Sequence, residues 1–540
     1  MIDLRQADSG TRFAADIAII GGGAAGIAMA HRLISSGLQV IIVESGGETL
    51  EPATQALYAG TASGVPYFPL DQSRYRLFGG STYRRGSRSA PFQHVDMEPR
   101  AWLGLDGWPI LRDSLQPWYD GVPALMDLHT PFDHSHVPWN RFRVHPPAID
   151  TSQLDFTGFQ FGKNLLFGEI FRKDLRAASN VLTLLHANVT KIATSERADH
   201  VTALQVRTLA GKTAEVHARK YVLAAGGIEN ARLLLLSDDR NPAGLCNDHD
   251  QVGRHFMEHP TASVGTIASD APQATHDIFS PGLLAGRLVE VCLQPSVTLM
   301  RHERILNANA ATRLNLGQDA TEALRQIVWN MRSRKVPMSL GWYRNNAWLR
   351  ERVGTILRNP FAIPGNLIRH AMGRPKRFAI DSVRLEVRIE QLPNPDSRVT
   401  LGAGRDAFGQ RRAHLDWRLT ETDWRTFRVM ADRVGAELAR LGLGRLSRAP
   451  WLDGPATAGP ESAGLNRVWP DDLVGGHHHM GTTRMSADPA KGVVDRNLKS
   501  HAKDNLWDLG SSVYPTSSQV NPTMTVLALA LRRAEHLKEL

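Results

Sequence analysis

The feature that most constrains this chain is a glycine-rich turn between two apolar runs near its start. Apolar Phe13–Ile20 leads into GGGAAG at 21–26, and the stretch IAMAHRLISS then closes at Gly37. A second apolar run at 38–43 ends at Glu44. This order predicts a strand, a tight turn, a helix and a second strand, which together make the βαβ unit of a parallel α/β sheet.

The spacing of the glycines indicates what this unit binds. Gly21, Gly23 and Gly26 satisfy G-x-G-x-x-G, in which one glycine makes the turn, one admits a pyrophosphate and one lets helix and strand pack closely. Glu44 ends the second strand, where a carboxylate can accept hydrogen bonds from a ribose. We therefore predict dinucleotide binding over a plain glycine-rich turn. The motif by itself does not separate FAD from NAD.

The sheet is predicted to draw on both ends of the chain, which at 540 residues is too long for one ordinary core. The run 181–192 is β-rich, and 221–227 ends in glycines before a helical stretch at 229–237. The run 505–512 repeats this order and precedes a helix predicted from Pro522 to Leu540.

A different pattern fills the middle of the chain. Residues 381–391 and 397–401 alternate polar and apolar side chains, which predicts antiparallel strands with one wet face. A helix predicted over 423–441 carries an apolar stripe that can pack on such a sheet. The stripe consists of Trp424, Phe427, Ala431, Val434, Leu438 and Leu441.

Several classes of protein are excluded or disfavoured. Cys246 and Cys292 are the only cysteines, too few for a disulfide framework or a four-cysteine zinc site, and they favour a reducing compartment. The N-terminus lacks the pattern of a secretory signal, and no run of about 18 apolar residues could span a membrane. We therefore expect a cytoplasmic protein.

The net charge of +9 is concentrated in one segment. Residues 323–377 hold twelve Lys or Arg against one acid, Glu351, so the segment carries +11 and the remainder about −2. This basic insert, which is also rich in aromatic residues, has three open interpretations: a solvated decoration, a surface for anionic lipid, or a docking site for an acidic partner or electron acceptor. No nucleic-acid recognition motif accompanies it.

Motifs along most of the chain resemble the glucose-methanol-choline (GMC) oxidoreductases, which use FAD to oxidise alcohols and sugars. The resemblance favours FAD over NAD and places the C-terminal motifs at the isoalloxazine ring. The motifs that carry it are IIGGGAAG with Glu44, LFGGSTYRRG (77–86), GWPI (107–110), VLAAGGIENARLLL (222–235), VGRHFMEHP (252–260), PNPDSRVTL (393–401), GGHHHMGTTRM (475–485) and GSSVYPTSSQVNPTMT (510–525).

Together, pattern and resemblance predict an α/β plus α+β architecture. A Rossmann-like FAD-binding domain, with a parallel sheet and a ββα-type nucleotide site, is expected from residues 12–260 and 475–540. Excursions into the second domain are expected near 90–170. The inserted substrate domain, an antiparallel sheet with helices, is expected at 261–474 and includes the basic insert.

The resemblance also implies two catalytic residues. The family's base is the histidine of an H-x-x-G-T pattern, which falls on His478 because Gly481 and Thr482 follow. The family's second catalytic position, often His or Asn, matches Asn521, which would hold the substrate oxygen while His478 takes the proton. Asn521 before Pro522 could also be a helix N-cap, and the two roles are compatible.

Neighbouring histidines receive structural roles. His477, His478 and His479 could form a metal clip, but adjacent residues on an extended strand point to opposite faces, and no carboxylate or cysteine partner is near in sequence. No metal site is therefore predicted. His477 and His479, like His255 and His259, are expected to pack or to support the site.

Further cofactor contacts follow from the resemblance. Backbone groups of Gly79, Gly80, Ser81 and Thr82 would approach the pyrophosphate or flavin. Some family members bind FAD through a histidine in this loop, but here the matching position is Arg84 and no histidine occurs between Gly79 and Ser89, so non-covalent FAD is expected. Arg84 could face phosphate or substrate. The remaining expected contacts are Val189, Gly226, Gly510, Ser511, Pro522 and Thr523.

The expected activity is oxidation of a CH–OH group of a sugar, glycoside or other alcohol, with hydride transfer to the flavin N5. The electron acceptor could be dioxygen, a quinone or a protein. A lyase on the same fold, a catalytically silent flavoprotein and an NAD-dependent dehydrogenase remain alternatives.

Overall fold

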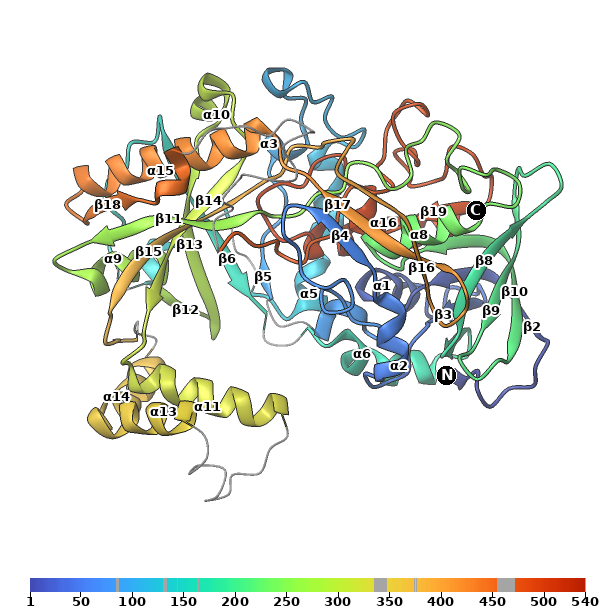
Figure 1. Cartoon of the computed structure of the whole chain (residues 1–540), viewed down its shortest axis with the longest axis horizontal. Coiled ribbons are helices and arrows are strands. Elements are labelled where there is room, and N and C mark those ends of the chain that lie inside the picture. Colours follow the sequence, from blue (N-terminus) through green and yellow to red (C-terminus); the bar gives the residue numbers. More distant parts are fainter. Residues whose placement is uncertain are drawn as a thin grey trace.

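Two large sheets and the helices packed on them make up most of the molecule (Figure 1). In Figure 1 one sheet lies to the right, near both chain termini, and the other to the left. The computed structural model describes residues 1–83, 87–129, 134–142, 144–162, 165–334, 347–372, 374, 376–453 and 472–539.

The first sheet is built on parallel strands, as the βαβ pattern predicts. Its order is β1-β7-β3-β2-β10-β9-β8, with β19 also paired to β10. Only β8 and β9 run antiparallel to their neighbours. Because β19 comes from near the end of the chain, this sheet is assembled from both ends. The strands are β1 Ile2–Asp3, β2 Thr11–Ile20, β3 Val40–Val43, β7 Val181–Leu185, β8 Asn188–Thr194, β9 Val201–Arg207, β10 Thr213–Leu223 and β19 Leu506–Asp508.

Three helices cover this sheet near its glycine turn. Helix α1 (Ala24–Arg32) follows β2 directly, α8 (Gly227–Leu236) follows β10, and α16 (Thr523–Lys538) packs against α1. All three bury most of their apolar side chains. The C-terminal end of the chain thus lies beside its N-terminal glycine turn, although about 500 residues separate the two in sequence.

The second sheet is antiparallel, in the order β18-β11-β15-β14-β13-β6-β5, with β12 paired to β13. Helix α15 (Glu421–Arg440) packs on it with the expected apolar stripe and begins two residues earlier than predicted, at a capping box made by Thr420 and Asp423. The strands are β5 Arg88–Ser89, β6 Leu154–Phe161, β11 Thr261–Ala268, β12 Gly282–Leu284, β13 Arg287–Pro295, β14 Ala308–Asn315, β15 Ser382–Ile389 and β18 Arg445–Arg448.

The strand expected at 397–401 does not pair with β15, the strand expected just before it. It lies in β16 (Arg398–Arg405), which pairs with β17 (Arg411–Trp417) in a small sheet completed by β4 (Thr61–Gly64). Strand β16 also packs against α8. The alternation in the sequence identified the strand but could not identify its partner, because pairing depends on distant residues.

The basic insert forms helices that project from the body of the molecule, below the second sheet in Figure 1. They are α11 (Ala320–Arg334), α13 (Ala347–Arg358) and α14 (Ala362–Ala371). Among the described residues, no helix is both long and apolar enough to cross a bilayer. The remaining helices are α2 Pro52–Gln55, α3 His94–Met97, α4 Gln116–Tyr119, α5 Val122–Met126, α6 Phe167–Ile170, α7 Arg172–Ala177, α9 Pro272–Phe279 and α10 Val297–Glu303.

Candidate active site

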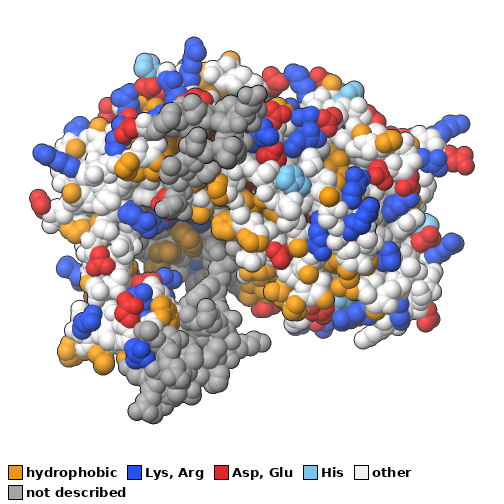
Figure 2. All heavy atoms as spheres, in the orientation of Figure 1, with side chains coloured by type: hydrophobic (Ala, Val, Ile, Leu, Met, Phe, Trp, Pro, Cys, Tyr) orange, Lys and Arg blue, Asp and Glu red, His pale blue; other side chains and the backbone are white. Residues whose placement is uncertain are grey.

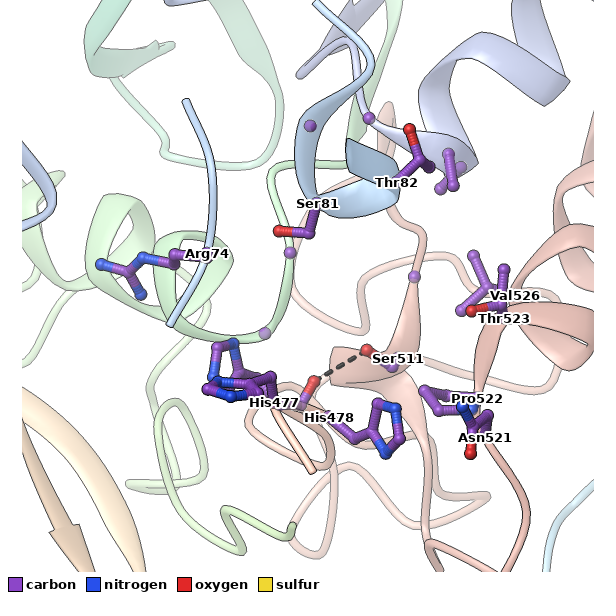
Figure 3. A pocket seen from close by; sticks show the side chains of 18 of the residues that line it. Arg74, Ser81, Thr82, His477, His478, Ser511, Asn521, Pro522, Thr523 and Val526 are labelled. Carbon is purple, nitrogen blue, oxygen red and sulfur yellow. Dashed lines mark hydrogen bonds between the residues drawn. The ribbon is translucent and has the colours of Figure 1, made fainter. Parts of the chain in front are cut away.

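A cavity of about 500 Å³ runs from the glycine turn after β2 to the wall formed by β13, β14 and β15. It brings together both ends of the chain and the second sheet. Figure 3 shows part of its lining, including the labelled side chains of His478 and Asn521. Most of the site residues expected from the sequence line this cavity: Gly21, Gly23, Glu44, Gly80, Ser81, Thr82, Gly226, His478, Gly510, Ser511, Asn521, Pro522 and Thr523.

The three glycines of the motif are needed for different structural reasons. A Cβ on Gly21 would lie 2.6 Å from the carbonyl oxygen of Ala224, and one on Gly26 would lie 2.1 Å from that of Gly21. These two glycines therefore allow close packing of turn, helix and strand. Gly23 differs, because a Cβ there would meet no atom within 4 Å. The open space in front of Gly23, at the N-terminus of α1, fits the pyrophosphate of a dinucleotide.

Glu44 ends β3 beside this turn and is only 5% exposed. Its two carboxylate oxygens accept hydrogen bonds from the backbone N–H of Gly22 and of Gly46, each at 2.7 Å. No cation of the described residues forms an ion pair with Glu44. Oε1 also accepts from the hydroxyl of Ser45 at 3.3 Å, whereas Oε2 accepts a single hydrogen bond from the described residues and retains capacity for a ribose hydroxyl.

The loop at 79–82 lies directly on the glycine turn. The N–H of Gly79 donates to the carbonyl of Gly22 at 2.7 Å, and a Cβ on Gly80 would lie 3.1 Å from the Cα of Gly23. Ser81 and Thr82 line the cavity, whereas Gly79 and Gly26 do not. Arg84 lies outside the described residues.

Val189 lines a separate hollow of about 50 Å³ rather than the main cavity. The two hollows share Gly21, Ser45, Tyr58 and Ala225, so the smaller one continues the space beyond Glu44. Its position at the far end from His478 fits the adenine end of a dinucleotide whose flavin end lies near that histidine.

Hydrogen bonds determine which ring nitrogen of His478 carries a proton. Nε2 of His259 lies 2.9 Å from the carbonyl oxygen of Ser518, an acceptor only, so this nitrogen must donate. Burial lowers the pKa of His259 to about 3, so its ring is neutral and its Nδ1 can only accept. Nδ1 of His478 lies 2.7 Å from that nitrogen and therefore donates to it.

The consequence is an unprotonated Nε2 on His478. Burial, and then the nearby His259 and Arg388, hold the pKa of His478 well below its ordinary value of 6.5, so this ring is also neutral. With the proton on Nδ1, Nε2 retains its lone pair. No described residue hydrogen-bonds this nitrogen, and the side chain lines the cavity. His478 is thus set up to accept a proton from a bound molecule.

A buried carboxylate holds the backbone of this segment. Oε2 of Glu258 accepts hydrogen bonds from the N–H of Gly476 at 2.9 Å and of His478 at 3.0 Å. Its other oxygen accepts from the hydroxyl of Tyr67, which also contacts Nε2 of His479 at 2.8 Å. Glu258 therefore positions the backbone from which the His478 ring projects.

Asn521 presents its amide N–H groups to the cavity. Nη1 of Arg388 lies 3.1 Å from Oδ1 of Asn521, and because a guanidinium can only donate, the amide oxygen faces Arg388. Nδ2 is then free to donate to a bound oxygen atom. The N-cap role considered for Asn521 is wrong: α16 begins at Thr523 and has no side-chain cap.

The wall next to Asn521 carries several charged side chains, of which Arg88 and Glu290 are buried. Glu290 accepts from Nε of Arg88 at 2.5 Å and from Nη1 of Arg313 at 2.6 Å, and Nε of Arg313 also donates to Glu386 at 3.0 Å. These contacts pair two guanidinium groups with two carboxylates. Arg388, on β15, also lines the cavity.

Two neighbouring histidines also line the cavity. His477 stacks on Phe68 with ring centroids 4.1 Å apart, and His479 contacts Tyr67. His259 contacts His478 and so supports the candidate base directly. No group of metal-ligating side chains occurs in the part of the chain that the structure describes.

Sequence reasoning missed Arg388 as a site residue. The alternating pattern of β15 marks Val383, Leu385, Val387 and Ile389 as buried, and all four are. The same pattern assigned the other face of the strand to water. Part of that face is the cavity wall, a distinction that periodicity cannot make because both environments accept charged side chains.

Comparisons with known proteins agree with this geometry. Two family models, both described as GMC oxidoreductase, match residues 169–261 and 393–530. A model described as lycopene cyclase protein matches residues 16–59, the segment that holds the glycine turn. The GMC matches include the segment of His259 and that of His478 and Asn521.

Curated relatives are similar over nearly the whole chain. The chain is 21% identical to the fructose dehydrogenase large subunit of Gluconobacter japonicus, over 98% of each protein. It is 24% identical to 6'''-hydroxyparomomycin C oxidase of Streptomyces lividus, over 96% of this chain and 90% of the relative. Among solved structures, pyridoxine 4-oxidase from Mesorbium loti matches with a TM-score of 0.56 and 20% identity, over 96% of this chain and 98% of that chain.

Proposed function

Since this chain belongs to the GMC oxidoreductase family, we propose that its cavity binds FAD and that His478 and Asn521 oxidise the CH–OH group of a bound alcohol or sugar. The observation that carries the proposal is the hydrogen bond between His478 and His259, which leaves Nε2 of His478 unprotonated on the cavity wall. A neutral imidazole with a free Nε2 is the group that removal of a hydroxyl proton requires.

The residues act on the substrate hydroxyl from two directions. Nδ2 of Asn521 donates a hydrogen bond to the hydroxyl oxygen and orients it, because Arg388 holds the other end of the amide. Nε2 of His478 accepts the hydroxyl proton as the carbonyl forms, while Nδ1 keeps its bond to His259. FAD supplies the acceptor for the hydride that leaves the carbinol carbon.

Several observations fit FAD in this cavity. The open space at Gly23 suits a pyrophosphate, and Glu44 is a buried carboxylate without an ion-pair partner among the described residues. We propose that the cofactor is held without a covalent bond, because no histidine occurs between Gly79 and Ser89. Acid precipitation tests this directly: the flavin should remain in the supernatant, and yellow colour in the pellet would contradict it.

The substrate class follows the relatives only at a coarse level. The curated relatives described above are named as a fructose dehydrogenase and a 6'''-hydroxyparomomycin C oxidase, and the substrate proposed here is a small alcohol or sugar. Dioxygen, a quinone and an acceptor protein all remain open as electron acceptors.

We also propose a cytoplasmic location, because the chain has two cysteines and both are free thiols. Cell fractionation tests that location.

The test is anaerobic mixing of the purified protein with sugars, glycosides and primary alcohols while the visible flavin band is followed. Bleaching by one class of substrate is expected. The His478→Ala variant should bleach about 100 to 10,000 times more slowly, and His217→Ala, at a half-exposed histidine far from the cavity, should behave as wild type. A colourless protein would favour an NAD-dependent enzyme, and a yellow protein that no substrate bleaches would favour a lyase or a silent flavoprotein.

The helices of the basic insert suggest a second property, peripheral binding to anionic lipid. Apolar side chains that are 53% to 83% exposed occur at the end of α13, in the turn after it and on α14. Basic residues lie among them, and Figure 2 shows apolar and basic side chains together on this projection. A surface that combines exposed apolar groups with positive charge suits the headgroup region of an anionic membrane. The exposed apolar residues are Leu357, Phe361, Leu367, Ile368 and Met372.

A further inference from the structure

We propose that the substrate carries a carboxylate beside the carbinol carbon and that Arg388 binds it. The enzyme would then act on 2-hydroxy acids, including sugar acids. This inference rests on the proposed function and narrows its substrate class. It starts from the contacts of Arg388, a cationic side chain on the cavity wall that has no carboxylate partner among the described residues.

Among the residues that the structure describes, the charges around the cavity leave Arg388 without an ion-pair partner. Arg88 and Arg313 share Glu290, and Arg313 also contacts Glu386. Within the described part of the chain, the hydrogen bonds of Arg388 go to neutral oxygens: Nε donates to Oγ1 of Thr261 at 3.3 Å and Nη1 to Oδ1 of Asn521 at 3.1 Å. Three guanidinium groups thus face two carboxylates.

A cation in this position is costly unless an anion joins it. Burial lowers the pKa of Arg388 to about 10, below its ordinary value, which shows that its surroundings disfavour the charge. A bound carboxylate would offset that cost and could accept from a planar guanidinium through two oxygens. Nη2 of Arg388 makes no hydrogen bond to any described residue, so it is free for this contact.

The position of Arg388 specifies where the anion lies on the substrate. One hydrogen bond separates its guanidinium from the amide that orients the substrate hydroxyl. With the hydroxyl oxygen held between Asn521 and His478, a group attached to the carbinol carbon comes within reach of Arg388. A carboxylate there makes the substrate a 2-hydroxy acid, whereas an anion several carbons away would lie beyond Arg388.

The reaction balances without a further reactant. The carbinol carbon loses a hydride and its hydroxyl loses a proton to His478, so the 2-hydroxy acid becomes a 2-oxo acid. A bound FAD would supply the acceptor for that hydride and its two electrons. The carboxylate keeps its charge throughout, and its contact with Arg388 serves binding and orientation only.

Matched pairs of substrates test the inference. L-lactate and D-lactate are compared with the enantiomers of 1,2-propanediol, and D-gluconate with D-glucitol, by the rate of anaerobic flavin bleaching. In at least one pair the acid should have a kcat/KM at least 10 times that of its neutral partner. Loss of the contact with Asn521 in Arg388→Gln should slow both members of a pair, but kcat/KM should fall about 100-fold further for the acid than for its neutral partner, and that extra loss should appear mainly in KM.

A binding measurement gives a readout apart from turnover. Propionate has no hydroxyl to oxidise, and its binding to the wild-type holoenzyme should perturb the flavin absorbance, whereas propionamide should not. Arg388→Gln should weaken the propionate response at least tenfold, and Arg388→Lys should restore part of it. Arg384→Gln is the matched control, because Arg384 lies on the same strand but is half exposed and contacts Asp472.

The outcomes separate this inference from the proposed function. If neutral alcohols bleach the flavin as fast as their acids and propionate does not bind, the carboxylate inference is wrong while the proposed oxidation stands. If no alcohol or acid bleaches the flavin, the proposed function itself fails. If Arg388→Gln lowers kcat/KM equally for the acid and for its neutral partner, then Arg388 only orients Asn521, and its role in binding the anion is overturned.

Discussion

Nδ1 of His478 lies 2.7 Å from Nδ1 of His259, and the second nitrogen of His259 is held by the carbonyl oxygens of Ser517 and Ser518. Both rings are neutral, and Nε2 of His259 already carries the proton of its own ring. The proton in the hydrogen bond between the two rings therefore belongs to Nδ1 of His478. A pair of backbone carbonyls therefore controls, through His259, which nitrogen of His478 carries the proton. This relationship leads to the first prediction.

Replacing His259 should impair proton removal more than substrate binding. His259→Phe should lower kcat about 100-fold with little change in KM, because His478 loses the acceptor that keeps its proton on Nδ1. His259→Gln, which can still accept at its side-chain oxygen, should recover part of the rate. A rise in KM with kcat unchanged, or no change in either constant in His259→Phe, would contradict this role.

The wild-type enzyme should not lose activity through protonation of His478 under mildly acidic conditions. The pKa of His478 lies well below 6.5, and the base works only when unprotonated, so kcat/KM for a neutral alcohol should stay level from pH 8 down to 6. Stopped-flow flavin reduction measures this profile. An acidic limb with a midpoint near 6.5 would mean that the ring is solvated rather than buried.

Asn521 should be replaceable only by a residue that donates a hydrogen bond. Asn521→Asp removes the donor and places a carboxylate 3.1 Å from Nη1 of Arg388, so kcat should fall about 100-fold or more. Asn521→His keeps a donor and should retain more activity. The retained flavin spectrum of each variant shows that the cofactor site is intact, and equal activity of the two would contradict the donor role.

Replacing two glycines of the same motif by alanine should affect different properties of the protein. Gly23→Ala meets no protein atom within 4 Å, so the apoprotein should keep its Tm, but the added methyl group should lower the ratio of bound flavin to protein. Gly26→Ala places a Cβ 2.1 Å from the Gly21 carbonyl and should destabilise the fold by about 1–3 kcal/mol. Thermal unfolding and flavin absorbance distinguish the two. Gly354→Ala, in open space on α13, is the control: it should keep the ratio of bound flavin to protein and should not lower the Tm.

The projecting helices should bind anionic vesicles. Sedimentation with vesicles rich in phosphatidylserine should capture the protein at low salt, and capture should weaken as salt rises because screening reduces the attraction of the basic residues. Phe361→Asp combined with Leu367→Asp should abolish capture without changing flavin reduction. Absence of capture at low salt would leave the insert as a solvated decoration.

Part of the fold could be predicted because the determining interactions are local. The β2 turn and α1 depend on three glycines within six residues, and the stripe on α15 depends on a 3.6-residue period. The partner of β16 could not be predicted, because strand pairing joins residues that are distant in sequence. The helix cap considered at Asn521 was wrong because α16 begins at Thr523, after Pro522, and the side-chain oxygen of Asn521 contacts Arg388, 133 residues away in sequence.

The sequence by itself determined the βαβ unit, the family resemblance and the identity of His478 and Asn521 as the pair to examine, because each follows from short motifs with their own chemistry. Only the tertiary structure decided the protonation of His478 and the exposure of Arg388 to the cavity. Both depend on contacts across three segments, around residues 259, 388 and 517–521, that no local pattern connects. A charged residue on an alternating strand gives the same sequence pattern whether its side chain faces bulk water or a cavity. Only the packing of the folded protein distinguishes these two environments.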